Sequence, residues 1–529
     1  MLRAVLVGIA VVASLGDFSF AADRFWIDTG GGSFTDTGKW SITSAGGGGA
    51  SVPVAGDSAI FDQAGNYTVT LSSNHALDVL DVEAGTITFD STGGAQTYDL
   101  LTGGADALFV GSDVTINGTN LNIGDDFSVA DGSMLVQGGS DVTVGDTASI
   151  ATGTGNAMVT FNASSFDFGG RLRLALSGLD GTLNLQNGST GNIDGDLEFV
   201  RSGTLGSGGF LNVSSASTLT TGGAVLVGDI LSNGSPSYNA FLTLENANSV
   251  LTMNGANNLR VGDSQFDNVN AELRVRNGGT FETGIGGGNS IVQRTGLIAV
   301  ESGGTFTARN DLLVNQTGEV TVTGGTLNTD AQFVIDATSS VTLDGGAINA
   351  NAGLDNSAGG TLSLRNGLLT VTGGVFSPNA GVADVDDFTI DGNFPIESPR
   401  LTIGAGASTS IGRALIVGGT NRGELTVNGG GTVSVDNGAG LVGSGADSTG
   451  TMTVTGANST WSATQQLIIG GAGNGTLTIG DGGQVSNGLG GVVGSVGDSA
   501  GDVMVTGSGS TWINTSTLTV AMSGDGTLT

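Results

Sequence analysis

The sequence predicts an all-β fold, a single-stranded right-handed parallel β-helix (β-solenoid) with rungs of about 21–28 residues. Glycine supplies 97 of 529 residues, proline 5 and cysteine none, and no Gly-X-Y period is present. Apolar residues make up 38% of the chain and occur in short bursts that alternate with polar residues, which is typical of β-strands. These bursts recur at short intervals, and units so small must stack on their neighbours to bury an apolar face.

Residues 1–21 have the parts of a secretory signal peptide. Arg3 provides the positive start, Ala4–Leu15 the apolar stretch, and Ser19–Ala21 the small-x-small cleavage site. A buried N-terminal strand is the alternative. The preferred interpretation is export of this acidic chain, to the extracellular space or the outer surface of a bacterial cell.

Residues 22–95 are predicted to form an N-terminal cap and the first rungs. Trp26 and Trp40, the only lysine (Lys39) and the only histidine (His75) lie in this block. The end of a solenoid exposes an unpaired strand edge and an open apolar core. A block of different composition at that position is therefore interpreted as a cap.

Residues 96–400 are predicted to form an irregular solenoid. Segments such as "IAVESGGTF" and "VTVTGGTL" share a pattern of apolar–x–apolar followed by a glycine pair and another apolar residue. The first glycines of these pairs are Gly278, Gly303, Gly324, Gly345 and Gly373. Their uneven steps indicate rungs with corner loops of different length, and the register upstream of about residue 270 stays unassigned.

Residues 401–529 are predicted to form a regular solenoid with a 51-residue repeat of two rungs. "VTGANSTW" (Val454–Trp461) returns as "VTGSGSTW" (Val505–Trp512). Pairing Met452 with Leu477 places Trp461 within a residue of Val485. The structural repeat residues are Trp461, Trp512, Leu477, Ile479, Gly482, Gly483 and Val485.

The tryptophans of this repeat are interpreted as core or corner plugs, with an exposed sugar platform as the alternative. Glycine, asparagine and aspartate are expected at the sharp corners between strands, where a positive φ is required. The chain stops inside a repeat, so the C-terminus is interpreted as truncated. Self-association through an exposed C-terminal edge is one expected consequence.

The C-terminal repeat resembles one shared by autotransporter (type V secretion) passengers and by proteins that carry the PEP-CTERM sorting signal. The matching residues are Val454, Gly456, Ser459–Trp461, Leu467–Gly470, Gly475–Ile479, Gly482–Gly483 and Val485, with partial recurrence at 415–433 and 503–529. The specific match covers about 115 residues. The resemblance implies a secreted, adhesin-like rod. Neither an anchoring β-barrel pattern nor a sorting signal follows it, so the export route stays open.

The charge balance excludes several classes of partner. The formal net charge is −33, and Lys39 is the only lysine, which argues against nucleic acid or anionic lipid. No segment after the signal peptide approaches the length of an apolar transmembrane helix. The absence of cysteine excludes thiol nucleophiles, thiolate metal sites and disulfides.

Candidate chemistry is sparse, and no catalytic or cofactor-binding residue is assigned. The one dense acidic cluster contains Asp384, Asp386 and Asp387, which are weak candidates for Ca²⁺, the only cofactor considered, or for a hydrolase pair. A solvated loop between rungs is the preferred interpretation. Arg171 and Arg173 alternate with leucines, so both are expected to face outward, with substrate clamping as the alternative.

These observations favour a non-catalytic structural or adhesin-like rod whose polar, repetitive face contacts glycans or other cell-surface or matrix proteins. The alternative is a polysaccharide-active β-helix enzyme, a lyase or glycoside hydrolase, or a carbohydrate-binding module. A subunit of a surface lattice is a third hypothesis. Fold alone does not choose among them.

Overall fold

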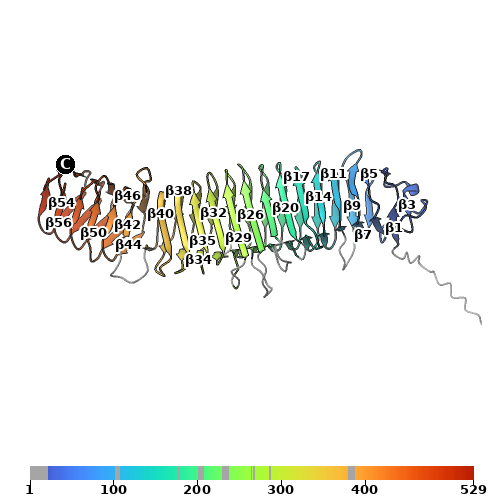
Figure 1. Ribbon diagram of the computed structural model, residues 1–529, viewed down its shortest axis with the longest axis horizontal. Helices are drawn as coiled ribbons and strands as arrows, with labels where there is room; N and C mark the ends of the chain where they lie inside the picture. Colours follow the sequence, from blue (N-terminus) through green and yellow to red (C-terminus); the bar gives the residue numbers. More distant parts are fainter. Residues whose placement is uncertain are drawn as a thin grey trace, which may run out of the picture.

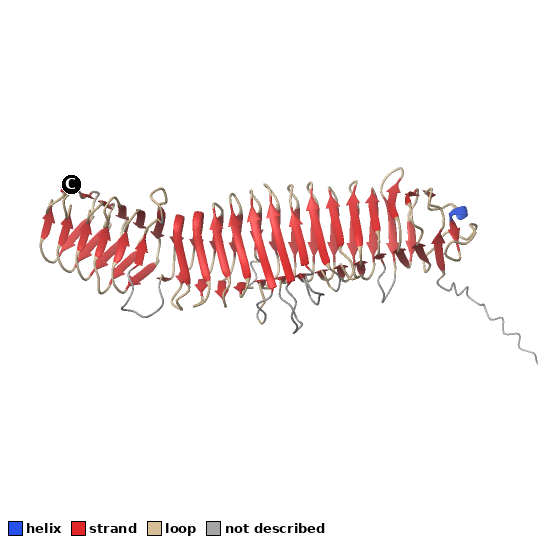
Figure 2. Ribbon diagram, viewed as in Figure 1, coloured by secondary structure: helices blue, strands red, loops and turns tan. Residues whose placement is uncertain are grey.

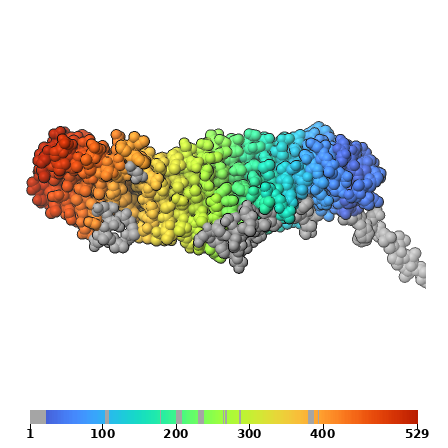
Figure 3. Space-filling model, viewed as in Figure 1, coloured from blue at the N-terminus to red at the C-terminus, as the bar shows by residue number. Residues whose placement is uncertain are grey.

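The computed structural model confirms the predicted all-β, parallel β-solenoid, which forms an elongated rod (Figures 1 and 3). It describes residues 22–101, 108–176, 179–199, 208–228, 238–263, 265, 269–284, 288–378, 388–392 and 394–529. Among these residues, the only helix is the 3₁₀ turn η1 (Thr37–Lys39), visible in blue in Figure 2. The same residues contain no helix that is long and apolar enough to span a membrane.

A typical rung contains one short strand and two further strands joined by tight corners. One such rung consists of β13 (Phe127–Val129), β14 (Gly132–Gln137) and β15 (Asp141–Val144). Each strand pairs in parallel with its counterpart in the next rung, namely β16 (Ala148–Ile150), β17 (Ala157–Asn162) and β18 (Ser165–Phe168). The short strands build a 16-stranded sheet, and the others build most of a 31-stranded sheet.

The core is a set of apolar columns that run along the rod. Strand side chains alternate between the two faces of a sheet, and β26 (Tyr238–Glu245) alternates between buried and partly exposed residues over its whole length. Leu242 pairs with Leu211 below it and Leu273 above it, and all three are fully buried. Burying a leucine contributes about 1.5–3 kcal/mol, so each added rung lengthens a continuous core.

The rungs vary in length more widely than the glycine pairs of the sequence predict. The shortest steps lie near β10 (Leu108–Val110), where Leu108 pairs with Phe127 of the next rung, a spacing below the predicted range. In β25 (Val225–Val227), Val225 pairs with Leu259 of β28 (Leu259–Val261), a spacing above that range. The strands keep their register because the length differences are taken up in the connections between them.

Aromatic side chains close the N-terminal end of the rod. Strand β1 (Asp23–Trp26) pairs in parallel with β4 (Ser58–Phe61) on one side and antiparallel with β3 (Trp40–Ser41) on the other. Trp26 and Trp40 face each other across the antiparallel pair, and their ring centroids lie 5.2 Å apart at 84°. Both rings are fully buried. The antiparallel strand thus covers the edge that β1 would otherwise expose.

The way in which successive rungs pair changes near the C-terminal end of the 16-stranded sheet. The 16-stranded sheet ends at β41 (Phe376–Ser377), and β42 (Phe388–Ile390) begins a new six-stranded sheet. Only the second half of β40 (Thr361–Val371) pairs with the following rung, through β43 (Pro399–Ile403). Two stretches of solenoid therefore meet at this step, which is visible in Figure 2 between the long central strands and the C-terminal rungs.

The C-terminal rungs stack with the tryptophans in register. Trp461 of β50 (Thr460–Ala463) pairs with Val485 of β53 (Gln484–Asn487), which pairs in turn with Trp512 of β56 (Thr511–Asn514). Gly482 has a φ of +88°. A Cβ on Gly483 would collide with the carbonyl oxygen of Val454. Side chains at these two corner positions would strain or block the turn.

Replacing Trp461 with alanine is expected to destabilise the C-terminal rungs by about 3–5 kcal/mol, because it empties a large volume in a close-packed core. Hydrogen exchange of the amides in β50 and β53 measures this change. The control is Thr460→Ala, which removes the neighbouring outward side chain and should cost about 0.5 kcal/mol or less. Equal losses of protection in the two variants would contradict a packing role for the indole.

Candidate functional site

The structure places most of the predicted repeat residues inside the solenoid. Trp461 is 1% exposed, and Leu477, Ile479 and Val485 are fully buried. The indole of Trp461 therefore has no face open to a sugar. Trp512 lies partly buried against the core, and its Nε1 donates a hydrogen bond to Asn487 Oδ1 at 2.9 Å.

The acidic cluster of Asp384, Asp386 and Asp387 lies outside the described residues. A different group of carboxylates is close enough to hold a cation. Asp125, Asp126 and Asp146 each offer an oxygen, and these oxygens lie within 4.8 Å of one another. Asp126 also accepts a hydrogen bond from the backbone N–H of Thr147 at 2.9 Å.

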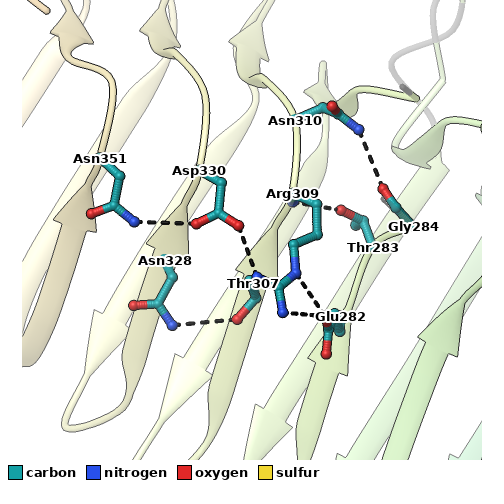
Figure 4. A network of polar contacts seen from close by, with 9 residues as sticks. All are labelled: Glu282, Thr283, Gly284, Thr307, Arg309, Asn310, Asn328, Asp330 and Asn351. Carbon is teal, nitrogen blue, oxygen red and sulfur yellow. Dashed lines mark hydrogen bonds and ion pairs between the residues drawn. The ribbon is translucent and has the colours of Figure 1, made fainter. Parts of the chain in front are cut away.

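The outward faces carry ladders of polar side chains that hydrogen-bond from rung to rung. In one of them, Asn349 donates to Asn328 at 2.8 Å, and Asn328 donates to Thr307 at 3.3 Å. Figure 4 shows the second of these two hydrogen bonds. These residues come from β38 (Ser340–Ala350), β36 (Thr326–Thr329) and β33 (Thr305–Ala308). Each amide thus orients the next one along the rod.

The same arrangement recurs on other faces. Asn212 of β23 (Gly208–Val213) donates to Asn184 at 2.8 Å, and Asn184 of β20 (Asp180–Gln186) donates to Thr160 at 3.3 Å. On the C-terminal rungs, a shallow hollow of about 340 Å³ is lined mainly by hydroxyl side chains. They are Ser408, Thr409, Ser410, Thr432, Ser434, Thr460 and Ser462, with Val375 and Val433.

Several arginines on these faces are held in ion pairs. Arg309 lies between Glu282 and Asp330, with its Nη1 2.9 Å from the Asp330 carboxylate (Figure 4). Arg171 and Arg173 share the carboxylate of Glu198, at 3.2 and 3.1 Å. Partly exposed pairs of this kind contribute about 0–1 kcal/mol each. Their main effect is to fix the direction of the side chains.

One hollow combines an aromatic ring with charged groups. It measures about 230 Å³ and is lined by Phe241 and Thr243 of β26 and by Glu272, Arg274 and Arg276 of β29 (Val269–Arg276). Burial alone would lower the pKa of Arg274, but the hydrogen bond that it donates to Glu272 and the charges of Glu272 and Glu301 raise it. The guanidinium therefore stays charged.

Sequence reasoning missed both this hollow and the carboxylate group around Asp126. Phe241 and Glu272 are paired across neighbouring rungs although they lie far apart in the sequence. The pairing depends on the lengths of corner loops that no regular repeat marks in this part of the chain. The alternation between buried and outward residues of a strand was predictable, but the stacking partner was not.

Asp81 and His75, two partly buried titratable groups, lie near the N-terminal end. Burial, followed by the nearby charges of Glu83 and Asp23, raises the pKa of Asp81 to about 6, and its Oδ1 has no hydrogen-bond partner. Burial also lowers the pKa of His75, whose ring centroid lies 4.4 Å from that of Phe34. Both shifts reflect the cost of placing a charge in this part of the rod.

Comparison with known proteins assigns no function to the chain. No protein-family model and no curated protein matches it. Among solved structures, the chain is similar to a fragment of TibA described as hyper-glycosylated in a reaction catalysed by TibC. The two share 14% sequence identity, and the match covers 76% of this chain and 94% of that one at a TM-score of 0.18. A likeness this weak carries no argument about activity.

Asp81→Asn is expected to stabilise the N-terminal rungs at pH 7 by about 1 kcal/mol, a value reduced for the partial exposure of the group. The folded-state pKa of Asp81, about 6, lies above its ordinary value of 3.8. The buried charge therefore lowers the free energy of unfolding progressively as the pH rises from about 4 to above 6. Below that range the carboxyl is neutral in both states, and the loss is absent. Urea denaturation at pH 3.5 and pH 7 measures the difference between variant and parent.

The matched control is the same substitution at Asp502, an exposed residue at the far end of the rod. It should change the urea midpoint equally little at both pH values. The lowered pKa of His75 acts in the opposite direction, removing stability as the pH falls below about 6.5, and it cancels when variant and parent are compared. A stability gain for Asp81→Asn that is the same at pH 3.5 and pH 7 would contradict the assignment.

Proposed function

We propose that the protein is an exported, non-catalytic rod at the extracellular or outer cell surface, with an adhesin-like role. The observation that carries this proposal is the set of rung-to-rung ladders on its outward faces, such as Asn349–Asn328–Thr307. These ladders present hydroxyl and amide groups at the spacing of the strands, about 4.8 Å. The proposed partners are glycans or other cell-surface or matrix proteins.

The ladders suit weak, repeated contact. Each amide in a ladder is already oriented by its neighbour, so a partner loses less side-chain entropy when it binds. A partner with its own repeated groups can meet several rungs at once, and such multivalent contact raises the overall affinity without any strong single site. The formal net charge of the chain, −33, favours solubility because the rods repel one another.

The carboxylates beside the arginines favour a structural role over a catalytic one, because they hold the arginine side chains in place. Glycoside hydrolysis needs two carboxyl groups in different protonation states on either side of the bond to be cleaved. Glu198 and Glu282 instead pair with arginines. The hollow at Phe241 favours the carbohydrate-binding alternative, because it combines an aromatic ring with polar groups.

The proposal predicts no turnover when the mature chain is incubated with a panel of neutral and acidic polysaccharides. Release of new reducing ends, or of unsaturated ends absorbing in the ultraviolet, measures turnover. Depolymerisation of any one polysaccharide that is abolished by Asp384→Ala, Asp386→Ala and Asp387→Ala together would overturn the non-catalytic assignment.

Mass spectrometry of the exported chain should give Ala22 as its first residue.

The adhesive part of the proposal has its own measurement. Beads coated with the mature chain should be retained on cell surfaces or matrix under flow more strongly than beads coated with an unrelated acidic protein. Soluble chain in excess should compete with the beads, and the multivalent beads should bind more tightly than the monomer. Retention no greater than that of the control beads would overturn the adhesive role.

A further inference from the structure

Two phenylalanines interrupt the polar outward face of the long sheet. Phe210 and Phe241 are paired across β23 and β26, and each points away from the core, between inward neighbours that are fully or almost fully buried. Their ring centroids lie 5.6 Å apart at 63°. Most outward residues around them are threonine and asparagine, so the core does not require an aromatic pair at this place. Both side chains are partly exposed, so the pair leaves apolar surface on a polar face, where a ligand can contact it.

The next rung places polar groups beside these rings. Phe241 pairs with Glu272, and Thr243 pairs with Arg274, so both rungs contribute to the hollow of about 230 Å³. That volume is below the ~300–1,000 Å³ of pockets for drug-sized ligands. It suits one small ring, with one wall aromatic and the other walls able to donate and accept hydrogen bonds.

The charges in the hollow are already compensated. Arg274 Nη2 lies 2.6 Å from Glu272, and its Nε lies 3.6 Å from Glu301. Arg276 Nη2 lies 2.8 Å from Glu245. Two guanidinium groups therefore face three carboxylates, which disfavours a phosphate, sulfate or carboxylate ligand. Each guanidinium has five N–H donors in a fixed plane, so donors remain for uncharged hydroxyl groups.

We propose that this hollow binds one neutral sugar residue of a glycan chain. The apolar face of the ring stacks on Phe241, while its hydroxyl groups accept from Arg274 and donate to Glu272, with Thr243 able to do either. This inference deepens the proposed adhesin-like role and rests on it: it names the site and the class of ligand that the rod would contact.

The neighbouring column extends the site along the rod. Asn212 and Asn184 lie in the same outward column as Thr243 and Arg274, one and two rungs below Thr243. A glycan chain lying parallel to the rod axis would pass from the aromatic pair onto these amides. The site thus recognises a segment of chain, with the ring on Phe241 as its anchor.

The test uses the mature chain and three neutral probes: maltoheptaose, cellohexaose and a pentamer of β-1,4-linked N-acetylglucosamine. Isothermal titration and saturation-transfer NMR measure binding. At least one probe is expected to bind, and Phe241→Ala should raise its Kd at least tenfold. Phe241→Trp, which keeps an aromatic face, should retain the binding.

The matched control is Phe394→Ala, which removes a phenylalanine that is 63% exposed and lies far along the chain from the hollow. It should leave the Kd unchanged. Thermal denaturation verifies that Phe241→Ala still folds; if it does not, Glu272→Gln replaces it and should also weaken binding, because it removes an acceptor for sugar hydroxyls. Failure of all three probes to bind, or binding that neither variant changes, would overturn the inference.

The outcomes separate this site from the wider proposal. If coated beads adhere to surfaces but no probe binds in a Phe241-dependent way, the adhesive role stands and the sugar site falls. If the beads do not adhere but a probe binds in a Phe241-dependent way, the site stands and the adhesive role falls. Stronger binding of polygalacturonate or heparin than of every neutral probe would overturn the choice of an uncharged ligand.

Discussion

The structure depends on the in-register parallel pairing of successive rungs. Because each strand hydrogen-bonds to its counterpart in the next rung, every side chain lies directly above the equivalent one. Leu242 therefore joins an apolar column with Leu211 and Leu273, while its neighbour Phe241 stands on the opposite face. A slip of one residue would exchange the two faces, burying the polar ladders and exposing the core. Core, corners and outward ladders all follow from this single constraint.

Buried serines at the corners reinforce the register where apolar packing ends. Ser189 is fully buried, its backbone N–H donates to Ser217 Oγ at 3.1 Å, and its own Oγ donates to the Phe161 carbonyl oxygen at 2.9 Å. Ser164 donates its N–H to Ser189 Oγ in the same way. Backbone groups at a buried turn must be satisfied, and here one rung satisfies those of the next. The corner hydrogen bonds therefore help to fix how successive rungs stack.

The sequence allowed the regular part of this arrangement to be predicted because its spacing is nearly constant. Met452 pairs with Leu477, as the repeat predicts, and Trp461 pairs with Val485 itself, although the repeat placed it only to within one residue. The hollow at Phe241 was not predictable. Its parts come from successive long rungs, and their stacking depends on corner loops whose lengths follow no repeat. Fold class is a property of the strand pattern, whereas this site is a property of loop lengths.

The separation of the two faces also shows where function can reside. Inward positions are filled mostly by apolar side chains that occupy the space between rungs, so they carry little information about partners. Outward positions have no such limit, and threonine or asparagine satisfies the sheet at most of them. An aromatic pair there, as at Phe210 and Phe241, stabilises the cross-strand contact but leaves part of its apolar surface in contact with water. A ligand that stacks on the pair would remove this surface from water, and that burial would supply part of its binding free energy.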